Sequence, residues 1–590
     1  MNILSSLMAA YERLPDAPPF GYSTEKVGVV VGLNEDGTVA TVTPWLEGEG
    51  RKRKPRPMLV PQAVKRTAGI APNFLWDKTA YVLGVTAGEG KRTAEEHRAF
   101  VERHLADIGD SEDVGLRALK RFLEAWTPDQ FAEPLWTDEL KDQNVVFALE
   151  SERRSGTNLH DRPAAKALWN RAAGAVGDAA EICLVTGEPG PVARLHPSIK
   201  GVWGAQSSGA ALVSFNLDAF TSYGREQGAN APVSEAAAFA YTTMLNRFLE
   251  RDSGHRLQIG DASTVFWADA SGRGAEEAEA LFAAYLDDVG DARAEEKISA
   301  EHIRGQLARI RAGDHLEDIE PDLADGVDFY VLGLAPNAAR LSVRFSYAGS
   351  FGDITRNYQK FVSDMRIEPP PRDGYPPLWR YLLETAVLGK RENVTPNLAG
   401  DWMRAILSGT PYPLSLMASV LTRIRADGEV NALRVGILKA LLIRNFKKEA
   451  TPVALDPANT NRGYVLGRLF ALYEEIQRAA LGGRVNATIK DKFYGSASAT
   501  PRKVFAVLDG GSANHLAKIR KLNIGREVNL QRQLQALMDL MSPSDDPALD
   551  PFPVSLTAQE QAYFGLGYHH QRSDFFKKAS ETASAGETEA

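Results

Sequence analysis

The chain has 590 residues, of which 44% are hydrophobic and 24% charged, so most of it is expected to fold around buried cores. At roughly 100–200 residues per domain this length predicts several structural units, and no run approaches the ~20 apolar residues of a membrane span. The single cysteine, Cys183, excludes an internal disulfide and any multi-cysteine zinc site. We therefore expect a soluble, multidomain, cytoplasmic protein.

The charge of the chain is unevenly distributed. The net charge of −8 argues against a nucleic-acid partner, yet residues 51–66 contain seven basic residues and no acidic one. Residues 441–532 carry a net charge of +9, and residues 261–330 a net charge of −12. Because screening limits electrostatic reach to about 10 Å at ordinary salt, local basic fields can bind phosphates whatever the total charge.

The first 145 residues are predicted to form a mixed β/α domain. Two β-branched runs flank Asp36-Gly37, a pair that can take the positive φ angles of a tight hairpin turn. A further strand-like apolar run follows the basic segment, which therefore lies between strands, on a loop or hairpin. The expected elements are a helix at Met1–Leu14, strands at Val27–Leu33, Thr38–Thr43 and Tyr81–Val85, and helical structure over Lys91–Trp126.

Residues 146–368 mix strand-like runs with longer helical stretches such as Ser234–Glu250, which predicts a central α+β domain. Its acidic part, Glu276–Asp328, is rich in helix-forming residues and favours a solvated helical face over an acidic metal site. The strand-like runs are Ile182–Val185, Ala211–Phe215, Thr264–Ala268, Phe329–Leu334 and Leu341–Phe345.

A proline-rich connector at 369–376 precedes a region of different character. Apolar residues at helical spacing predict a helical bundle over 377–578, followed by a disordered tail at 579–590. The stripes are Val465, Leu469, Leu472, Ile476 and Ala480, and then Leu530, Leu534, Leu537 and Met541. Six cations are expected off these stripes or near helix ends, where they give the bundle a basic exterior and are the candidate contacts to a displaced or target DNA strand: Arg468, Arg478, Lys518, Arg520, Lys521 and Arg526. The predicted fold class is α+β multidomain, with an all-α C-terminal bundle.

Recognisable catalytic chemistry is absent from the sequence. There is no P-loop and no His-Glu-x-x-His run, and the ten histidines are scattered apart from His569-His570. We expect no catalytic residue, no metal and no cofactor. An alternative is a metal-dependent nuclease that uses Asp322, Asp325 and Asp328, whose spacing of three suits one helical face but leads directly into an apolar strand.

The segment from Arg51 to Arg66 is the clearest candidate for a nucleic-acid contact in the sequence. Lysine and arginine neutralise phosphates, whereas an asparagine side chain can pair with a base edge and an aromatic ring can wedge or stack. The alternative is a solvated basic hairpin with Phe74 and Trp76 in the core. The candidate DNA-binding residues are Arg51, Lys52, Arg53, Lys54, Arg56, Lys65, Arg66, Asn73 and Phe74.

Several runs together resemble the large subunit of the type I-C CRISPR Cascade complex, from Met1 to beyond Tyr464. They are Lys54-Pro55-Arg56, Ile70–Leu75, Tyr81–Gly84, Cys183–Glu188, Ala193–Pro197, Ser207–Ala210, Gly224–Gly228, Asp328–Leu334 and Asn461–Tyr464. The resemblance implies a protein without catalytic activity in an RNA-guided DNA surveillance complex. Guide pairing would read the target, while this subunit recognises the protospacer-adjacent motif in duplex DNA, helps open it and stabilises the R-loop.

The implied partners are double-stranded target DNA, the guide RNA, the backbone, guide-end-capping and small subunits, and a separate helicase-nuclease. In this subtype the small subunit comes from an internal start in the same gene, and the helical C-terminal region fits such a module. Two alternatives remain beside this interpretation: a nuclease subunit using the acidic region, and a structural scaffold that binds only guide RNA.

Overall fold

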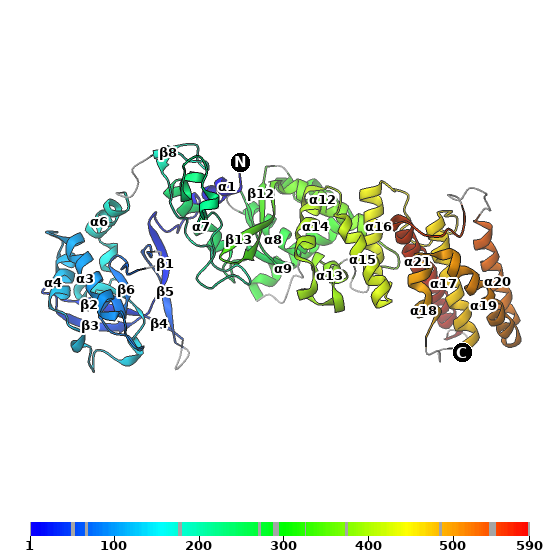
Figure 1. Ribbon diagram of the computed structural model, residues 1–590, viewed down its shortest axis with the longest axis horizontal. Helices are drawn as coiled ribbons and strands as arrows, with labels where there is room; N and C mark the ends of the chain where they lie inside the picture. The colour runs from blue at the N-terminus through cyan, green and yellow to red at the C-terminus, as the bar shows by residue number, and fades with distance from the viewer. Residues whose placement is uncertain are drawn as a thin grey trace. The chain divides into compact units, whose positions relative to one another are not determined.

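The computed structural model describes residues 2–48, 53–64, 66, 69–174, 180–269, 273–286, 294–324, 326–371, 374, 376–482, 487–541 and 550–587 (Figure 1). The chain divides into two compact units. The N-terminal unit comprises Asn2–Ile199 and Ala211–Arg247. The C-terminal unit comprises Lys200–Ala210 and Phe248–Ala590. The boundaries of these units differ from those of the expected domains. The strand pairing and the buried cores described below account for the difference.

A four-stranded sheet lies in the N-terminal unit, in the order β3 (Val39–Pro44), β2 (Val29–Leu33), β7 (Asn144–Leu149), β6 (Trp76–Lys78). The predicted hairpin joins β2 to β3, with Gly37 at a φ of 89° and Asn34 N donating to Thr38 O at 2.9 Å. β7 pairs in parallel with β2 and antiparallel with β6. The expected boundary at residue 145 therefore falls inside a central strand of this sheet.

A second, three-stranded antiparallel sheet of this unit has the order β1 (Tyr22–Val27), β5 (Lys54–Pro61), β4 (Leu46–Glu47).

Helices pack on the four-stranded sheet, where buried Phe147 and Leu149 of β7 share a core with Leu119 and Phe122. The other elements are α1 (Ile3–Glu12), α2 (Thr79–Val82), α3 (Thr93–Ile108), α4 (Val114–Ala125), α5 (Glu150–Arg153), α6 (Pro163–Gly174), β8 (Ala180–Ile182), β9 (Pro189–Pro191) and α7 (Glu235–Phe248), whose last residue belongs to the C-terminal unit.

Three predicted strands of this unit differ in the structure. Tyr81 and Val82 lie in the short helix α2, and the strand of this region is β6, which precedes it. Only Ile182 of the run Ile182–Val185 is in a strand, and Ala211–Phe215 contains no extended strand. Short apolar runs have similar compositions in strands, in short helices and in buried turns. Composition alone therefore does not determine which of these elements a short run forms. The helices predicted at Met1–Leu14 and Lys91–Trp126 are confirmed as α1 and as α3 with α4.

The C-terminal unit contains a four-stranded antiparallel sheet in chain order: β10 (Arg256–Ile259), β11 (Ala262–Ala268), β12 (Asp328–Asn337) and β13 (Arg340–Ser350). Between β11 and β12 the acidic region forms α8 (Arg273–Leu286), α9 (Ala294–Ala312), α10 (Leu316–Ile319) and α11 (Pro321–Ala324), so its predicted helical character is confirmed. Phe266 and Phe329 of the sheet belong to the same buried cluster as Trp402, Leu469 and Phe564. Because this core runs through both regions, the proline-rich connector does not separate two compact units.

The remaining helices follow the sheet. They are α12 (Phe351–Met365), α13 (Leu378–Leu383), α14 (Pro396–Ser408), α15 (Leu414–Asp427), α16 (Ala432–Phe446), α17 (Arg462–Leu481), α18 (Ile489–Ala497), α19 (Pro501–Leu522), α20 (Ile524–Asp539) and α21 (Ala558–Glu587). α17 lies beside α18, α19, α20 and α21 (Figure 1). Its predicted apolar stripe is buried. Side chains at Gly467 and Gly567 would collide with backbone of the facing helix, so these glycines allow α17 and α21 to pack closely.

The end of the chain differs from its prediction. Residues 579–587, expected to be disordered, continue α21 as helix, and residues 588–590 lie outside the described residues. This segment contains several alanines and glutamates, which have high helix propensity and can extend a helix already begun. The α+β fold class and the helical C-terminal region are confirmed.

Candidate nucleic-acid interface

The basic segment is partly strand and partly loop. Lys54 and Arg56 lie on β5 and Arg53 precedes it directly, so these three cations are on or beside a strand rather than between strands. All three are exposed, and among the described residues none of them pairs with a carboxylate. The predicted contacts Arg51, Lys52 and Lys65 lie outside the described residues.

The alternation of β5 explains why these cations are exposed. Side chains two residues apart point to the same face of a strand, so Lys54, Arg56, Met58 and Val60 share a face. Val60 is fully buried and Met58 packs against the same small apolar cluster. Towards the start of the strand this face leaves the core, and the Arg56 guanidinium lies 5.1 Å from the centre of the Trp45 ring. Apolar packing at one end of β5 therefore holds a basic end in solvent.

The neighbouring strand adds a cation that the sequence did not single out. Lys26 of β1 is exposed and stands opposite Pro57 of β5, on the other face of the sheet from Arg56. Arg56 N donates to Trp45 O at 3.1 Å, which fixes the backbone beside the basic end. No sequence signal marked Lys26, because its place depends on the pairing of β1 with β5.

Arg66 has a different role from the cations of β5. Its guanidinium forms an ion pair with Asp77, its Nε donates to Ala71 O at 2.7 Å, and it stacks 4.1 Å from the centre of the Tyr81 ring. The Asp77 side chain is 1% exposed and also accepts from Asn73 N at 2.8 Å. Burial raises the pKa of Asp77, while these hydrogen bonds and the charge of Arg66 oppose the shift. Arg66 thus holds the loop to β6 instead of extending freely into solvent.

Asn73 and Phe74 are buried, contrary to the expectation of a surface ready to meet bases. Asn73 is 4% exposed, and its Oδ1 accepts from Val64 N at 2.9 Å. Phe74 is 1% exposed and stacks against Trp169 and His104, at centroid distances of 5.3 and 5.9 Å. An aromatic ring in such a stack contributes to the core. In this conformation the Phe74 ring is therefore not exposed to insert between bases.

Backbone geometry and a buried histidine hold this loop. Leu75 has a φ of 61°, a left-handed conformation that is uncommon for a branched side chain. Leu75 N donates to His104 Nε2 at 2.7 Å, while His104 Nδ1 lies 2.7 Å from Phe100 O. Burial lowers the pKa of His104 to about 3, so the ring is neutral, with Nδ1 as the donor to Phe100. The residues around Asn73 are therefore held in a fixed shape.

Of the predicted C-terminal cations, Arg468 is not on the exterior. It is 7% exposed; its Nε donates to Gln571 Oε1 at 3.0 Å, and its NH1 donates to the carbonyl oxygens of Asp456 and Pro457. The apolar stripe predicted from the sequence identifies one buried face of α17 but does not show whether its other sides are covered. In the structure α21 covers the side that carries Arg468. The guanidinium links α17 to the preceding loop and to α21, which is a structural role.

The other five cations are exposed or half-exposed, but two of them share a carboxylate. Arg478 and Arg526 donate to the two oxygens of Glu475, at 2.8 and 3.0 Å. Lys518, Arg520 and Lys521 lie exposed near the C-terminal end of α19, where cations are also favoured by the helix dipole. Among the residues that the structure describes, these three have no carboxylate partner.

The carboxylates of the nuclease alternative do not share a helical face. α11 ends at Ala324, and Asp328 begins β12. Asp325 lies outside the described residues. The predicted spacing of three therefore spans the end of a helix and the start of a strand, where side-chain direction follows a different period.

The described fold is that of an α+β protein with exposed basic side chains on a strand of its N-terminal unit and on a helix of its C-terminal unit. Residues 7–576 match the protein family described as CRISPR-associated protein (Cas_Csd1), and the chain belongs to that family. No curated protein matches the chain. Within the described ranges, no helix combines the length and apolar character required to cross a membrane.

Proposed function

We propose that this chain is the non-catalytic large subunit of a type I-C Cascade complex in the cytoplasm, where it recognises the protospacer-adjacent motif in double-stranded DNA. Membership of the CRISPR-associated family supports the setting. The single observation that carries the DNA-binding part is the basic end of β5, with Arg53, Lys54 and Arg56 exposed and without carboxylate partners among the described residues.

The chemistry of this strand suits a phosphate backbone. Each phosphate that these cations neutralise releases condensed counterions, which favours binding. The loop held by Asp77 follows the C-terminal end of β5, whereas the exposed cations lie at its N-terminal end. The residue that would read bases is therefore separated from the cations that would hold phosphates by the length of the strand. Contacts to phosphates set position, and a separate group must supply sequence preference.

Asn73 remains the candidate for the side chain that supplies sequence preference. Its Oδ1 is used by Val64 N, whereas its Nδ2 makes no hydrogen bond to another described residue. A carboxamide nitrogen can donate to an acceptor on a base edge. Base reading by Asn73 would require a local rearrangement, because the side chain is 4% exposed.

The C-terminal unit would act on a single strand. Lys518, Arg520 and Lys521 at the end of α19 form its exposed basic group, and such groups bind unpaired strands through the backbone. In this proposal the unit stabilises the R-loop, while guide RNA, the backbone, guide-end-capping and small subunits, and a helicase-nuclease supply pairing, assembly and cleavage.

The test replaces Arg53, Lys54 and Arg56 by alanine in the assembled complex and measures binding to motif-bearing duplex over a range of salt concentrations. The slope of log K against log salt should become shallower by about 0.9 for each phosphate that the variant no longer neutralises. A matched control replaces Lys91, Arg98 and Arg117, three exposed cations of the same unit, and should leave the slope nearly unchanged. Equal effects of the two triple variants would remove the proposed role of β5.

The variant Asn73→Ala tests base reading separately. Discrimination between correct and incorrect motifs should fall by about 1–3 kcal/mol if Asn73 pairs with a base edge. Binding to DNA with an incorrect motif should change little. Uniform weakening for all motifs would instead show that Asn73 only shapes the loop through Val64.

A further inference from the structure

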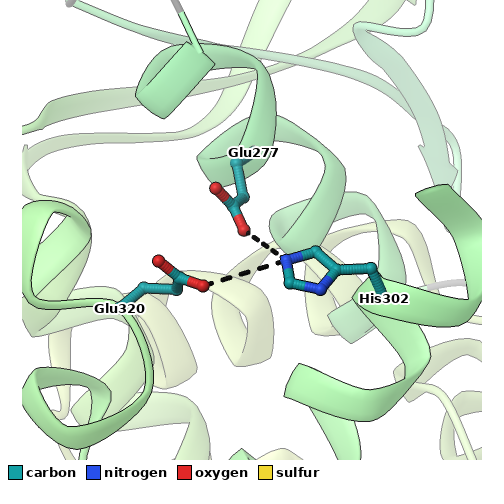
Figure 2. A group of neighbouring side chains, drawn as sticks. All are labelled: Glu277, His302 and Glu320. Atoms are coloured by element: carbon teal, nitrogen blue, oxygen red, sulfur yellow. Dashed lines mark hydrogen bonds and ion pairs between the residues drawn. The ribbon is translucent and has the colours of Figure 1, made fainter.

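Three side chains from separate helical segments of the acidic region converge in the C-terminal unit. Glu277 comes from α8, His302 from α9, and Glu320 follows α10 directly. Figure 2 shows the two carboxylates pointing at the same edge of the imidazole. His302 Nε2 lies 3.0 Å from Glu277 Oε1 and 3.8 Å from Glu320 Oε1, and donor atoms of all three lie within 4.8 Å of one another.

These separations suit a tetrahedral metal ion. Ligand nitrogen and oxygen atoms at about 2.0–2.1 Å from Zn²⁺ are about 3.3 Å apart in a tetrahedron. The separations of His302 Nε2 from the two carboxylate oxygens bracket that value. One imidazole and two carboxylates form a donor set that Zn²⁺ accepts, with a fourth position left for water.

A buried amide points into the cluster. Gln306 is 4% exposed and lies one helical turn after His302 on α9. Its Nε2 donates to Oε1 of both Glu277 and Glu320, and its Oε1 is buried without a hydrogen-bond partner among the described residues. Such a donor holds two carboxylates in place behind a metal ion, as outer hydrogen bonds do in metal sites.

The charges of the cluster favour a cation. The two carboxylate oxygens share the same Gln306 donor, yet no lysine or arginine among the described residues pairs with either glutamate. Converging carboxylates repel unless a positive charge lies between them. The His302 side chain is 50% exposed and that of Glu320 32%, so an ion can reach the site from solvent.

We infer that Glu277, His302 and Glu320 bind one Zn²⁺, with Gln306 as a positioning residue. The ion would join α8, α9 and the end of α10, and so stabilise the helices inserted between β11 and β12. This site does not depend on the proposed DNA binding. The sequence could not reveal it, since 25 and 18 residues separate the ligands and no compact spacing marks them.

The test titrates the purified, metal-free full-length chain with Zn²⁺ in competition with a chromophoric chelator. The wild type should bind one equivalent, and the thermal unfolding midpoint should rise with added Zn²⁺. His302→Gln and Glu320→Gln should weaken binding by about 100-fold or more, beyond the effect of an outer-shell change. His315→Gln and Asp322→Asn remove a nearby exposed histidine and carboxylate and should keep wild-type affinity.

The outcomes are distinct. Loss of binding in the His302 and Glu320 variants, with both controls unchanged and circular dichroism preserved, supports the site. Absence of a stoichiometric equivalent in the wild type overturns it. So does Zn²⁺ binding that His302→Gln leaves unchanged, because the ion then lies elsewhere. Because His302 is half exposed, its variant should fold and keep the experiment decisive.

Discussion

The basic end of β5 and the basic helices of the C-terminal unit look alike in composition and differ in structure. On β5, Lys54 and Arg56 extend from a strand whose other end is buried, and they have no carboxylate partner among the described residues. In α17, Arg468 is enclosed and Arg478 shares Glu475 with Arg526. The number of cations in a segment therefore does not determine how many can meet a phosphate. Their position relative to the core does.

The largest expected effect comes from Arg468. Arg468→Ala would leave Gln571 and the carbonyl groups of Asp456 and Pro457 without their donor, and we expect a decrease of about 3 kcal/mol in the free energy of unfolding of the C-terminal unit. Urea unfolding measures this decrease. Lys521→Ala, an exposed control, should stay within about 0.5 kcal/mol of wild type. If Arg468→Ala is equally mild, Arg468 is not a structural link between α17 and α21.

Arg66 sharpens the comparison within the N-terminal unit. Arg66→Ala would leave the buried Asp77 without its cation, at an expected cost of about 2–3 kcal/mol in stability. Lys54→Ala should leave stability unchanged and weaken DNA binding. Thermal unfolding and duplex binding of both variants give the two readouts. The reverse pattern would assign Arg66 to DNA and Lys54 to the fold.

Acid should loosen the loop that carries Asn73. The pKa of His104 is lowered to about 3 in the folded protein against about 6.5 when unfolded. The unfolded chain therefore binds more protons between these values, and stability falls as pH drops below 6.5. Between pH 7 and 5 this amounts to about 1–2 kcal/mol. Hydrogen-exchange protection factors over residues 71–78, which are corrected for the intrinsic exchange rate at each pH, should fall with acid in the wild type and less so in His104→Gln. A pH-independent loop would contradict the buried neutral ring.

Much of the fold could be predicted from the sequence, because periodic patterns are local. The β2–β3 hairpin and the buried stripe of α17 follow from turn chemistry and helical spacing. Arg468 could not be placed, since its burial depends on which side of α17 meets α21. The pairing of Arg66 with Asp77 and the cluster around His302 also depend on tertiary contacts between separate segments.

The most direct test of DNA recognition by β5 is crosslinking from this strand. A photoreactive amino acid at position 56 is incorporated into the assembled complex, alongside the same group at position 117 as a control, and the complex is bound to motif-bearing duplex. Position 56 should crosslink to target DNA near the motif, and position 117 should not. Absence of DNA crosslinks from position 56, or crosslinks to guide RNA alone, would contradict duplex recognition by β5 and favour a scaffold that holds the guide.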